Sequence, residues 1–281
     1  MTLPGDRGGP DRPPLADQVP DRPPLAGRAP DGPPLAGRPP LADRVALVTG
    51  ASGGIGQALA RRLATEGTQV ALGYGASAGP TQSLAAQILA DGGRAVAVQA
   101  DLRSPQGPED LIAATEDALG PVDILVSNAG RGHRQSLEEV SSSDFDDMIA
   151  VNLRAPFLLA QGVVPGMRER GFGRILFISS VAAFTGGIVG PHYAASKAGL
   201  HGLTHFLAAR LAGHGITVNA LAPALITGTT MLPGNPEELR KQVPAGRLGH
   251  PNEVADLALA VLTNSYLTNQ VISLDGGLHP R

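Results

Sequence analysis

The stretch that decides the fold is VALVTGASGGIGQALARRLA, residues 45–64. Its first five residues, 45–49, are mostly β-branched or otherwise apolar, which predicts a buried strand. A glycine-rich turn follows, with glycines at positions 50, 53, 54 and 56. Apolar residues then recur at helical spacing, which predicts a helix over 54–66. A strand, a tight turn and a helix in this order begin a βα unit.

Outward from this unit, short apolar runs alternate with longer helical patterns, as is typical of a parallel sheet with crossover helices. One continuous series predicts a single α/β domain over residues 41–281: a Rossmann-type doubly wound parallel sheet of seven strands with helices on both faces. Residues 224–249 are too long for an ordinary connection and are predicted to form a lid over a site. The predicted strands are 45–49, 70–74, 95–99, 124–127, 174–178, 217–221 and 271–273, and the predicted helices are 54–66, 81–90, 108–119, 144–170, 192–212 and 252–263.

The first 40 residues differ in composition from the rest of the chain. They hold 12 of the 25 prolines and repeat DRPPLA at 11–16 and 21–26, with DGPPLA at 31–36. Such a segment buries too little apolar surface to offset its ordering entropy, so residues 1–40 are predicted to be a disordered leader. The alternative is a ligand for a proline-recognising partner.

Composition excludes several classes of protein. A net charge of −3 gives no electrostatic case for nucleic acid or an anionic membrane surface. The absence of cysteine excludes disulfides, cysteine-ligated zinc and cysteine nucleophiles. No apolar run approaches the roughly 18 residues of a membrane span, and the first residues do not form the apolar core of a secretory signal. We therefore expect a soluble cytoplasmic protein.

The glycine-rich turn predicts a bound dinucleotide. Glycines there permit a tight turn and let the backbone approach a pyrophosphate, which sits at the N-terminus of the following helix. The spacing is Gly-x-x-x-Gly-x-Gly over residues 50–56, and it differs from the common Gly-x-Gly-x-x-Gly fingerprint.

This spacing resembles the turn of the short-chain dehydrogenase/reductase family, Thr-Gly-x-x-x-Gly-x-Gly, and within the family the chain is most similar to the 3-oxoacyl-(acyl-carrier-protein) reductases. The resemblance extends from about residue 41 to residue 277. Its further motifs are Asp101-Leu102, Asn128-Ala129-Gly130, Val151-Asn152, Ser179-Ser180, Tyr193 with Lys197, Asn219 to Pro223, and Asp275-Gly276-Gly277.

The resemblance implies a catalytic set and a cofactor set. The catalytic residues would be Asn152, Ser180, Tyr193 and Lys197, with Lys197 also holding the nicotinamide ribose and Asn152 anchoring a chain of waters. Ile226 would pack on the nicotinamide carboxamide. The cofactor-binding residues would be Gly50, Ser52, Gly53, Gly54, Ile55, Gly56, Ser77, Asp101, Leu102, Asn128, Ala129, Gly130, Tyr193, Lys197, Pro223 and Ile226.

Residue chemistry leads to the same catalytic group. Tyr193 and Lys197 are four apart on a predicted helix, so both point from one face. An ammonium beside a phenol is expected to lower the phenol pKa, which suits a proton donor to a carbonyl oxygen. Ser180 would hydrogen-bond the same oxygen. Chance is a poor explanation for a lysine four residues after this tyrosine, because Lys197 is one of only two lysines in the chain.

The end of the second strand bears on the cofactor. NAD enzymes place an acid there for the ribose 2′-hydroxyl, but this chain has no acid between Glu66 and Asp91. We therefore expect NADP(H) to be preferred, with NAD(H) as the alternative. Many NADP-dependent members carry an arginine where Gly53 stands, so Ser77 and backbone amides would have to hold the phosphate.

The sequence thus predicts an NADPH-dependent reductase that transfers hydride to a ketone resembling a 3-oxoacyl thioester. The alternatives are an alcohol dehydrogenase or polyketide-type ketoreductase acting on a free small molecule, and a catalytically silent binding protein. Acyl-carrier-protein reductases commonly have a basic residue where this chain has His214. The sequence therefore leaves open whether the substrate is attached to an acyl carrier protein. The family also implies a homotetramer or homodimer through the helices at 144–170 and 192–212.

Other polar residues are weaker candidates. His201 and His205 have the spacing of metal ligands, but no third ligand is apparent, so packing or subunit contact is favoured and no metal is expected. Arg131, His133 and Arg134 either meet an anionic or carbonyl substrate or are solvated loop residues.

Overall fold

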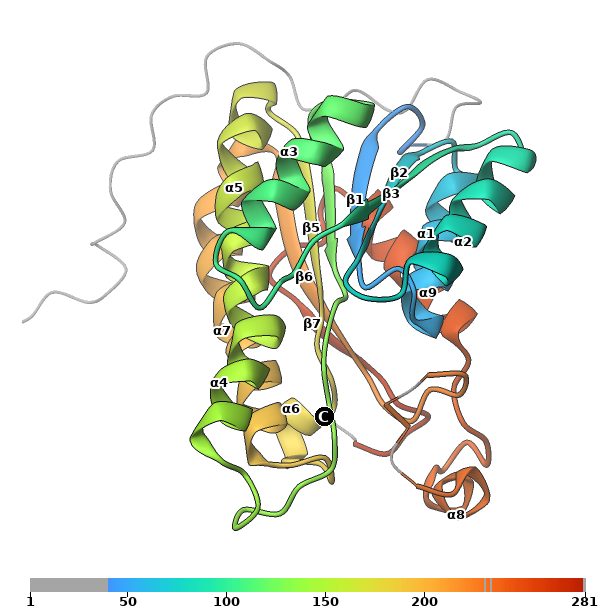
Figure 1. Ribbon diagram of the computed structural model, residues 1–281, viewed down its shortest axis with the longest axis vertical. Helices are drawn as coiled ribbons and strands as arrows, with labels where there is room; N and C mark the ends of the chain where they lie inside the picture. The colour runs from blue at the N-terminus through green and yellow to red at the C-terminus, as the bar shows by residue number, and fades with distance from the viewer. Residues whose placement is uncertain (1–39, 230, 233, 280–281) are drawn as a thin grey trace, which may run out of the picture. The chain divides into compact units, whose positions relative to one another are not determined.

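The computed structural model describes residues 40–229, 231–232 and 234–279. A seven-stranded sheet forms the centre, with every pairing parallel and the strand order β3-β2-β1-β4-β5-β6-β7. The predicted doubly wound sheet is confirmed (Figure 1). The strands are β1 (Val45–Thr49), β2 (Gln69–Tyr74), β3 (Arg94–Gln99), β4 (Ile124–Ser127), β5 (Gly173–Ile178), β6 (Ile216–Pro223) and β7 (Val271–Leu274).

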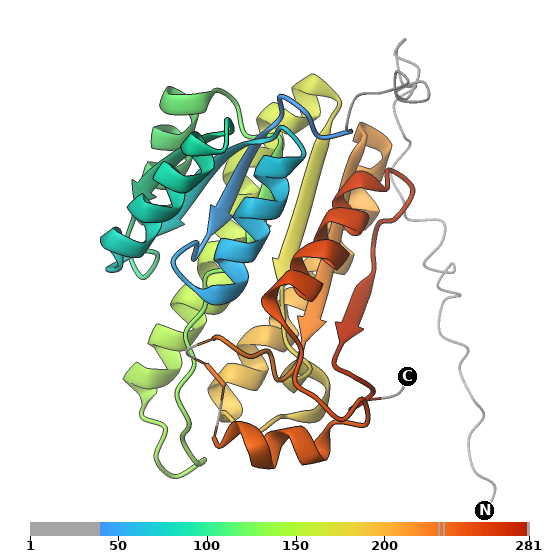
Figure 2. The ribbon, with the colours of Figure 1, turned by 90° about the vertical axis from the view of Figure 1, so that its right-hand side faces the viewer.

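Helices cover both faces of the sheet (Figures 1 and 2). One face carries α1, α2 and α9, and the other carries α3, α5 and α7, with α4 continuing beyond the sheet. The helices are α1 (Gly54–Thr65), α2 (Ala78–Ala90), α3 (Gly107–Leu119), α4 (Ser142–Ile149), η2 (Ala150–Arg154), α5 (Ala155–Arg170), α6 (Ala182–Thr185), α7 (Pro191–Leu211), η3 (Ala212–His214), α8 (Pro236–Gln242) and α9 (Pro251–Thr263).

The four central strands, β1, β4, β5 and β6, are buried at every position and mostly apolar, because both of their faces are covered. In β1, Ala46 and Val48 join the core under α1 and α9, whereas Leu47 joins the core under α5 and α7. This alternation follows from the two-residue period of a strand. Each fully buried leucine or valine contributes about 1.5–3 kcal/mol, so the core fixes the strand ends that carry the site.

The predicted helix over 144–170 is interrupted by a wide turn. Residues Ala150–Arg154 form a π-helix, in which the Ala155 amide donates to the Ala150 carbonyl. The next residue, Pro156, has no amide hydrogen, so the carbonyl four residues earlier, that of Asn152, cannot form an α-helical bond. π-turns of this kind often occur at functional sites.

Two short helices were not predicted. α6 has four residues, too few for a periodic pattern, and α8 lies inside the segment predicted to be a lid. In α8, Pro236 is in the first turn and the Asn235 side chain accepts from the Glu237 amide. The two ends of the 224–249 segment are joined by a parallel bridge between Ile226 and Gly249.

The predicted leader, residues 1–40, lies outside the described residues except for its last position. Among the described residues, the helical run Ser142–Arg170 is long and apolar enough to cross a membrane by length and composition, with a mean hydropathy of 1.3 over its most apolar window. The expectation that no run approaches a membrane span therefore fails for this segment. Half of that window is buried, and Leu159, Val163 and Met167 pack in the core, as in a core helix of a soluble protein.

Candidate functional site

The glycine-rich turn lies where the order of strands changes direction, between β1 and β4. Gly50 has a φ of +66°, and a Cβ there would lie 2.8 Å from the Ala129 Cα. A Cβ on Gly56 would overlap the Gly50 carbonyl oxygen. Asn128 ties the turn to the end of β4, because its side-chain amide donates to the carbonyls of Thr49 (3.0 Å) and Gly50 (3.2 Å). The turn is therefore a rigid cradle at the position where doubly wound folds bind ligands.

Two helix N-termini at this edge have no side-chain cap. α1 begins after Gly53 and α2 after Ser77, and neither residue donates or accepts a capping hydrogen bond. By contrast, Ser141 caps α4 in a full capping box. Uncapped N–H groups together with the helix dipole favour an anion. The donor set at these two positions fits the phosphates of a dinucleotide.

A cavity of about 670 Å³ runs along this edge, beyond the ends of β1, β2 and β3. It brings together seven of the predicted cofactor residues. They are Gly50, Ser52, Ser77, Asp101, Leu102, Ala129 and Gly130.

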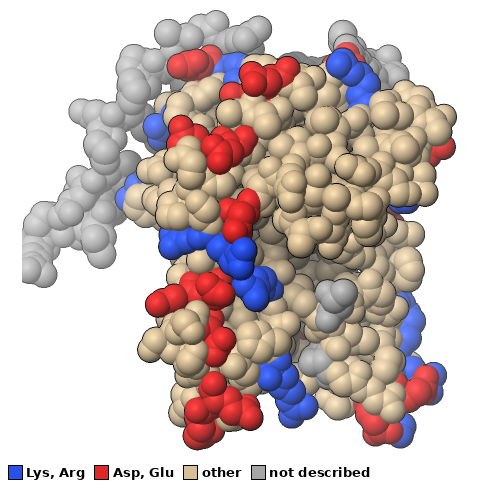
Figure 3. Space-filling view, viewed as in Figure 1, with Lys and Arg blue, Asp and Glu red and all other residues tan. Residues whose placement is uncertain are grey.

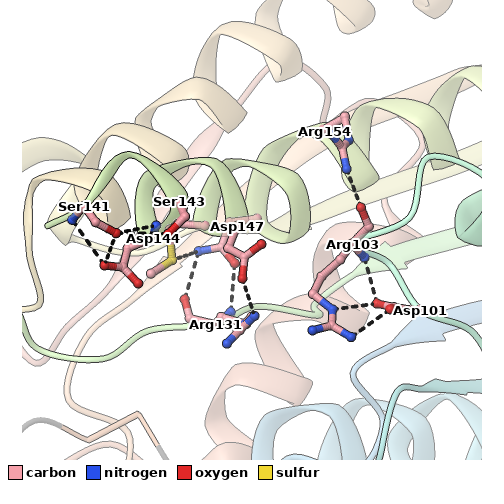
Figure 4. Close-up of polar contacts among 10 residues, drawn as sticks. Asp101, Arg103, Arg131, Ser141, Ser143, Asp144, Asp147 and Arg154 are labelled. Carbon is pink, nitrogen blue, oxygen red and sulfur yellow. Dashed lines mark hydrogen bonds and ion pairs between the residues drawn. The ribbon is translucent and has the colours of Figure 1, made fainter.

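Two cations line the same cavity: Arg131, which the sequence placed either at a substrate or in solvent, and Arg103, which sequence reasoning missed. Figure 4 shows both of them paired with acids. Arg103 donates two hydrogen bonds to Asp101, at 3.0 and 2.8 Å, and these hold the pKa of that carboxyl below its usual range. Arg131 lies 3.3 Å from Asp147 of α4. Figure 3 shows acidic and basic side chains next to one another on one face of the molecule. The charge at the cavity is likewise mixed, because Asp101 lines it together with Arg103 and Arg131.

A second cavity, of about 290 Å³, lies beyond the ends of β5 and β6. Three of the predicted catalytic residues, Ser180, Tyr193 and Lys197, line it. So do four predicted cofactor residues that the first cavity lacks, Ile55, Asn128, Pro223 and Ile226. Because Asn128 borders the second cavity and Ala129 the first, the two cavities meet at the glycine-rich turn.

Tyr193 and Lys197 are buried together on α7, with 7% and 3% of their surfaces exposed. The Lys197 ammonium donates to the Ile178 carbonyl at 2.8 Å and lies 5.9 Å from the centroid of the Tyr193 ring. Burial lowers the pKa of Lys197 to about 8. Burial also raises the pKa of Tyr193, against a smaller lowering by its hydrogen bond with Ser180. In the structure, burial therefore outweighs the lowering of the Tyr193 pKa that the sequence led us to expect.

Three hydrogen bonds clamp α7 to the end of β5. Besides the Lys197 bond to β5, the Ser179 hydroxyl donates to the Lys197 carbonyl at 3.0 Å. Since that uses the only hydroxyl proton of Ser179, the His201 Nε2, at 2.8 Å, must be the donor to Ser179. The clamp fixes Ser180 relative to the pair on α7.

Asn152 lines neither cavity. It is fully buried in the π-helix, and its side chain binds the Arg131 backbone both as acceptor (2.8 Å) and as donor (2.9 Å). It also donates to the Ser196 hydroxyl at 3.1 Å. Asn152 therefore joins the loop after β4 to α7, directly behind the cavity walls.

The remaining predicted cofactor residues, Gly53, Gly54 and Gly56, also line neither cavity. Gly54 is covered by the lid segment, since a Cβ on it would overlap the Gly228 carbonyl oxygen. Gly56 packs against the turn itself, as described above. The close approach of these backbones, which only glycine permits, shapes the cradle.

The two histidines with metal-ligand spacing have separate partners. His201 is in the clamp, and His205 lies 2.6 Å from the Asn269 side chain. Within the described residues, no group of three or more histidine or acidic side chains is arranged to hold a metal ion.

Comparison with known proteins identifies the family. A family model of short chain dehydrogenases matches residues 44–239. The chain belongs to the short-chain dehydrogenase family. Nodulation protein G of Azospirillum brasilense is 38% identical over 85% of this chain and 99% of that protein. A 3-oxoacyl-[acyl-carrier-protein] reductase of Synechocystis sp. is 38% identical over 85% of this chain and 98% of that protein.

The names of two further similar proteins mention a substrate and a cofactor. Acetoacetyl-CoA reductase of Rhizobium meliloti is 39% identical over 83% of this chain and 98% of that protein. The crystal structure of a blue fluorescent protein from a metagenomic library, in complex with NADPH, has a TM-score of 0.80 and 35% identity, covering 85% of this chain and 99% of that one. As a short-chain dehydrogenase, the protein is an NAD(P)-dependent oxidoreductase acting on CH–OH or C=O groups.

Proposed function

We propose that this chain is an NADPH-dependent reductase that converts the ketone of a 3-oxoacyl thioester to an alcohol, with Tyr193 as the general acid. The observation that carries the proposal is the burial of Tyr193 and Lys197 beside Ser180, at the edge of an apolar cavity next to the dinucleotide cradle. The names of two relatives, a 3-oxoacyl-[acyl-carrier-protein] reductase and an acetoacetyl-CoA reductase, support the same substrate class.

The bound cofactor would supply a hydride to the carbonyl carbon. As the carbonyl π electrons move to oxygen, the Tyr193 hydroxyl gives that oxygen its proton. Ser180 donates a hydrogen bond to the same oxygen and stabilises its developing charge. The Lys197 ammonium stabilises the phenolate left on Tyr193 and would also hold the ribose hydroxyls. Asn152 positions the loop after β4 and, as the family resemblance implies, anchors waters that return the proton.

The second cavity suits an acyl chain. Among its described lining residues, Lys197 is the only lysine, arginine or acid. Much of the apolar lining comes from the 224–249 segment, with Leu225, Met231, Leu232 and Leu239. A polyanionic group at the reacting carbon would find only one lysine or arginine among these residues, whereas an aliphatic chain loses water-exposed surface.

NADPH consumption tests the proposal. We expect the full chain to oxidise NADPH with acetoacetyl-CoA and with acetoacetyl carrier protein. Turnover of free ketones alone would instead favour an alcohol dehydrogenase or polyketide-type ketoreductase. No turnover with any carbonyl on a broad panel, despite NADPH binding, would favour a binding protein. The same proposal makes the protein a soluble cytoplasmic enzyme, in which one face of the half-buried apolar run Ser142–Arg170 packs in the core.

Cofactor preference is expected to favour NADPH by about 5–30-fold in kcat/KM, or about 1–2 kcal/mol. No carboxylate lies in the 73–77 stretch to repel a 2′-phosphate, and the uncapped α2 N-terminus with Ser77 can bind it. Arg103, which is paired with Asp101, offers a further donor in the same cavity. Ala76→Asp or Ser77→Asp should reverse the preference. Side-by-side kcat/KM values check this, and a wild-type preference for NADH would contradict it.

Reduction is expected to slow as pH rises through about 8. Below that value Lys197 is an ammonium, and above it the side chain is neutral, because burial lowers its pKa to about 8. Tyr193 keeps its proton over this range, since burial raises its pKa. A kcat/KM profile from pH 6 to 10 provides the measurement. Lys241→Met, which alters an exposed lysine paired with Glu238, should show the same profile. A flat wild-type profile would refute the role of Lys197.

The protein is expected to be a homotetramer or homodimer through α5 and α7. Both helices expose a large aromatic side chain, Phe157 (44% exposed) and Phe206 (55%), and α7 also exposes Ala195, Ala198 and Gly202. Light scattering at micromolar concentration should give a multiple of 28.6 kDa. Phe157→Asp with Phe206→Asp should reduce it, whereas Leu89→Asp on the opposite face should not. A wild-type monomer would contradict this assignment.

A further inference from the structure

The segment that follows β7 folds back over the second cavity. Asp275 holds it with both carboxylate oxygens: one accepts from the Gly277 amide at 2.9 Å and the other from the His279 amide at 3.1 Å. This turn brings Leu278 and His279 into the cavity wall. The motif Asp275-Gly276-Gly277 thus acquires a structural role that its sequence did not indicate.

The His279 ring is fixed by an aromatic stack. It lies parallel to the Phe184 ring, with centroids 5.8 Å apart and an interplanar angle of 12°. Phe184 also contacts the ring of His201, the clamp residue, with centroids 4.5 Å apart. Since α6, which carries Phe184, begins two residues after Ser180, the stack connects the 275–279 segment to the same wall as the catalytic serine.

We propose that Leu278 and His279 form a fixed steric wall that limits the size of the group carried by the reacting carbonyl. The inference rests on the proposed carbonyl reductase function. Backbone hydrogen bonds and ring stacking hold the wall in place, so a substrate would have to break these contacts to displace it. We expect a linear acyl chain to fit beside this wall and a phenyl group at the ketone carbon to meet it.

Two ketoesters of different bulk test the wall: ethyl acetoacetate, with a methyl group on the ketone, and ethyl benzoylacetate, with a phenyl group. The readout is the ratio of their kcat/KM values, bulky over small, with saturating NADPH. His279→Ala should raise this ratio by about tenfold, since discrimination by an apolar pocket is of that order per methylene-sized change. Leu278→Ala should change it in the same direction.

Matched variants separate size from polarity. His279→Phe preserves the stack and the bulk without the imidazole, so it should keep the wild-type ratio. His214→Ala removes a histidine from η3, which precedes β6 at the opposite edge of the sheet, and should also keep the ratio. If the kcat/KM ratio stays unchanged in both His279→Ala and Leu278→Ala, the proposed steric wall is contradicted. A ratio that changes equally in His279→Phe and His279→Ala also contradicts it.

A binding measurement distinguishes this inference from the proposed function. Calorimetric titration of the two esters into the protein with NADP⁺ needs no turnover. If the wild type reduces neither ester, the proposed function fails for these substrates. The steric wall is then tested only by the affinity of each ester for the protein. Tighter binding of ethyl benzoylacetate to His279→Ala than to wild type supports it, and equal affinity contradicts it.

Discussion

Tyr193→Phe is expected to reduce kcat by about 10²-fold or more, because the carbonyl oxygen loses its general acid. The ring is retained, so its packing with Met148 and Ala182 should persist. NADPH affinity, measured by fluorescence, should therefore change little. Burial and the raised pKa keep the wild-type phenol protonated, so the loss should hold at every pH below the phenol pKa.

The matched control for this loss is Tyr266→Phe, which alters a tyrosine that is 97% exposed. It should retain wild-type turnover. A Tyr193→Phe enzyme with close to wild-type kcat would show that another group supplies the proton.

Lys197→Met is expected to weaken NADPH binding as well as turnover, with kcat/KM reduced by about 10²-fold or more. In the proposed mechanism, the variant would lose the charge that stabilises the phenolate and the donor to the ribose hydroxyls. It also leaves the buried Ile178 carbonyl without its 2.8 Å partner, which should cost about 1–3 kcal/mol of folding stability.

The chain provides a direct control, since its only other lysine is Lys241 on the surface of α8. Lys241→Met should keep both activity and NADPH affinity. Thermal melts of both variants report the stability change separately. Lys197→Met with unaltered NADPH affinity would refute the cofactor contact, whatever its turnover.

The strands and the glycine-rich cradle were predictable because local residue patterns determine them. The strands at 45–49 and 124–127 have the predicted ends, since each is a short apolar run flanked by polar or turn residues. The glycine-rich turn was recognisable because close backbone approach leaves glycine as the only choice. Several predicted helix ends are exact, such as 54, 90, 119 and 263, and the others differ by one to three residues, where caps and turn geometry decide the boundary.

Other features depend on contacts that spacing does not encode. Arg103 enters the cofactor cavity because β3 pairs with β2, which brings its loop beside Ser77. His279 reaches the second cavity through a turn 86 positions after Tyr193 in the sequence. The π-turn at Asn152 could have been predicted from Pro156, which lacks an amide hydrogen. Helical periodicity alone predicted an uninterrupted helix.

The electrostatics of the catalytic pair were the hardest to predict. Spacing correctly placed Tyr193 and Lys197 on one helix, and from this we expected the ammonium to lower the phenol pKa. The degree of burial, which reverses the net shift of the Tyr193 pKa, comes from packing against Met148, Ala182 and Met231 and cannot be read from a four-residue interval.

Transfer of deuterium from labelled NADPH tests the central claim most directly. Acetoacetyl-CoA is incubated with the full chain and NADPH deuterated at C4 of the nicotinamide, using each stereoisomer in turn. We predict that one of the two isomers delivers one deuterium to C3 of the 3-hydroxybutyryl product, detected by mass spectrometry and NMR. A 3-hydroxybutyryl product without deuterium from either isomer, or no product at all, would contradict the account.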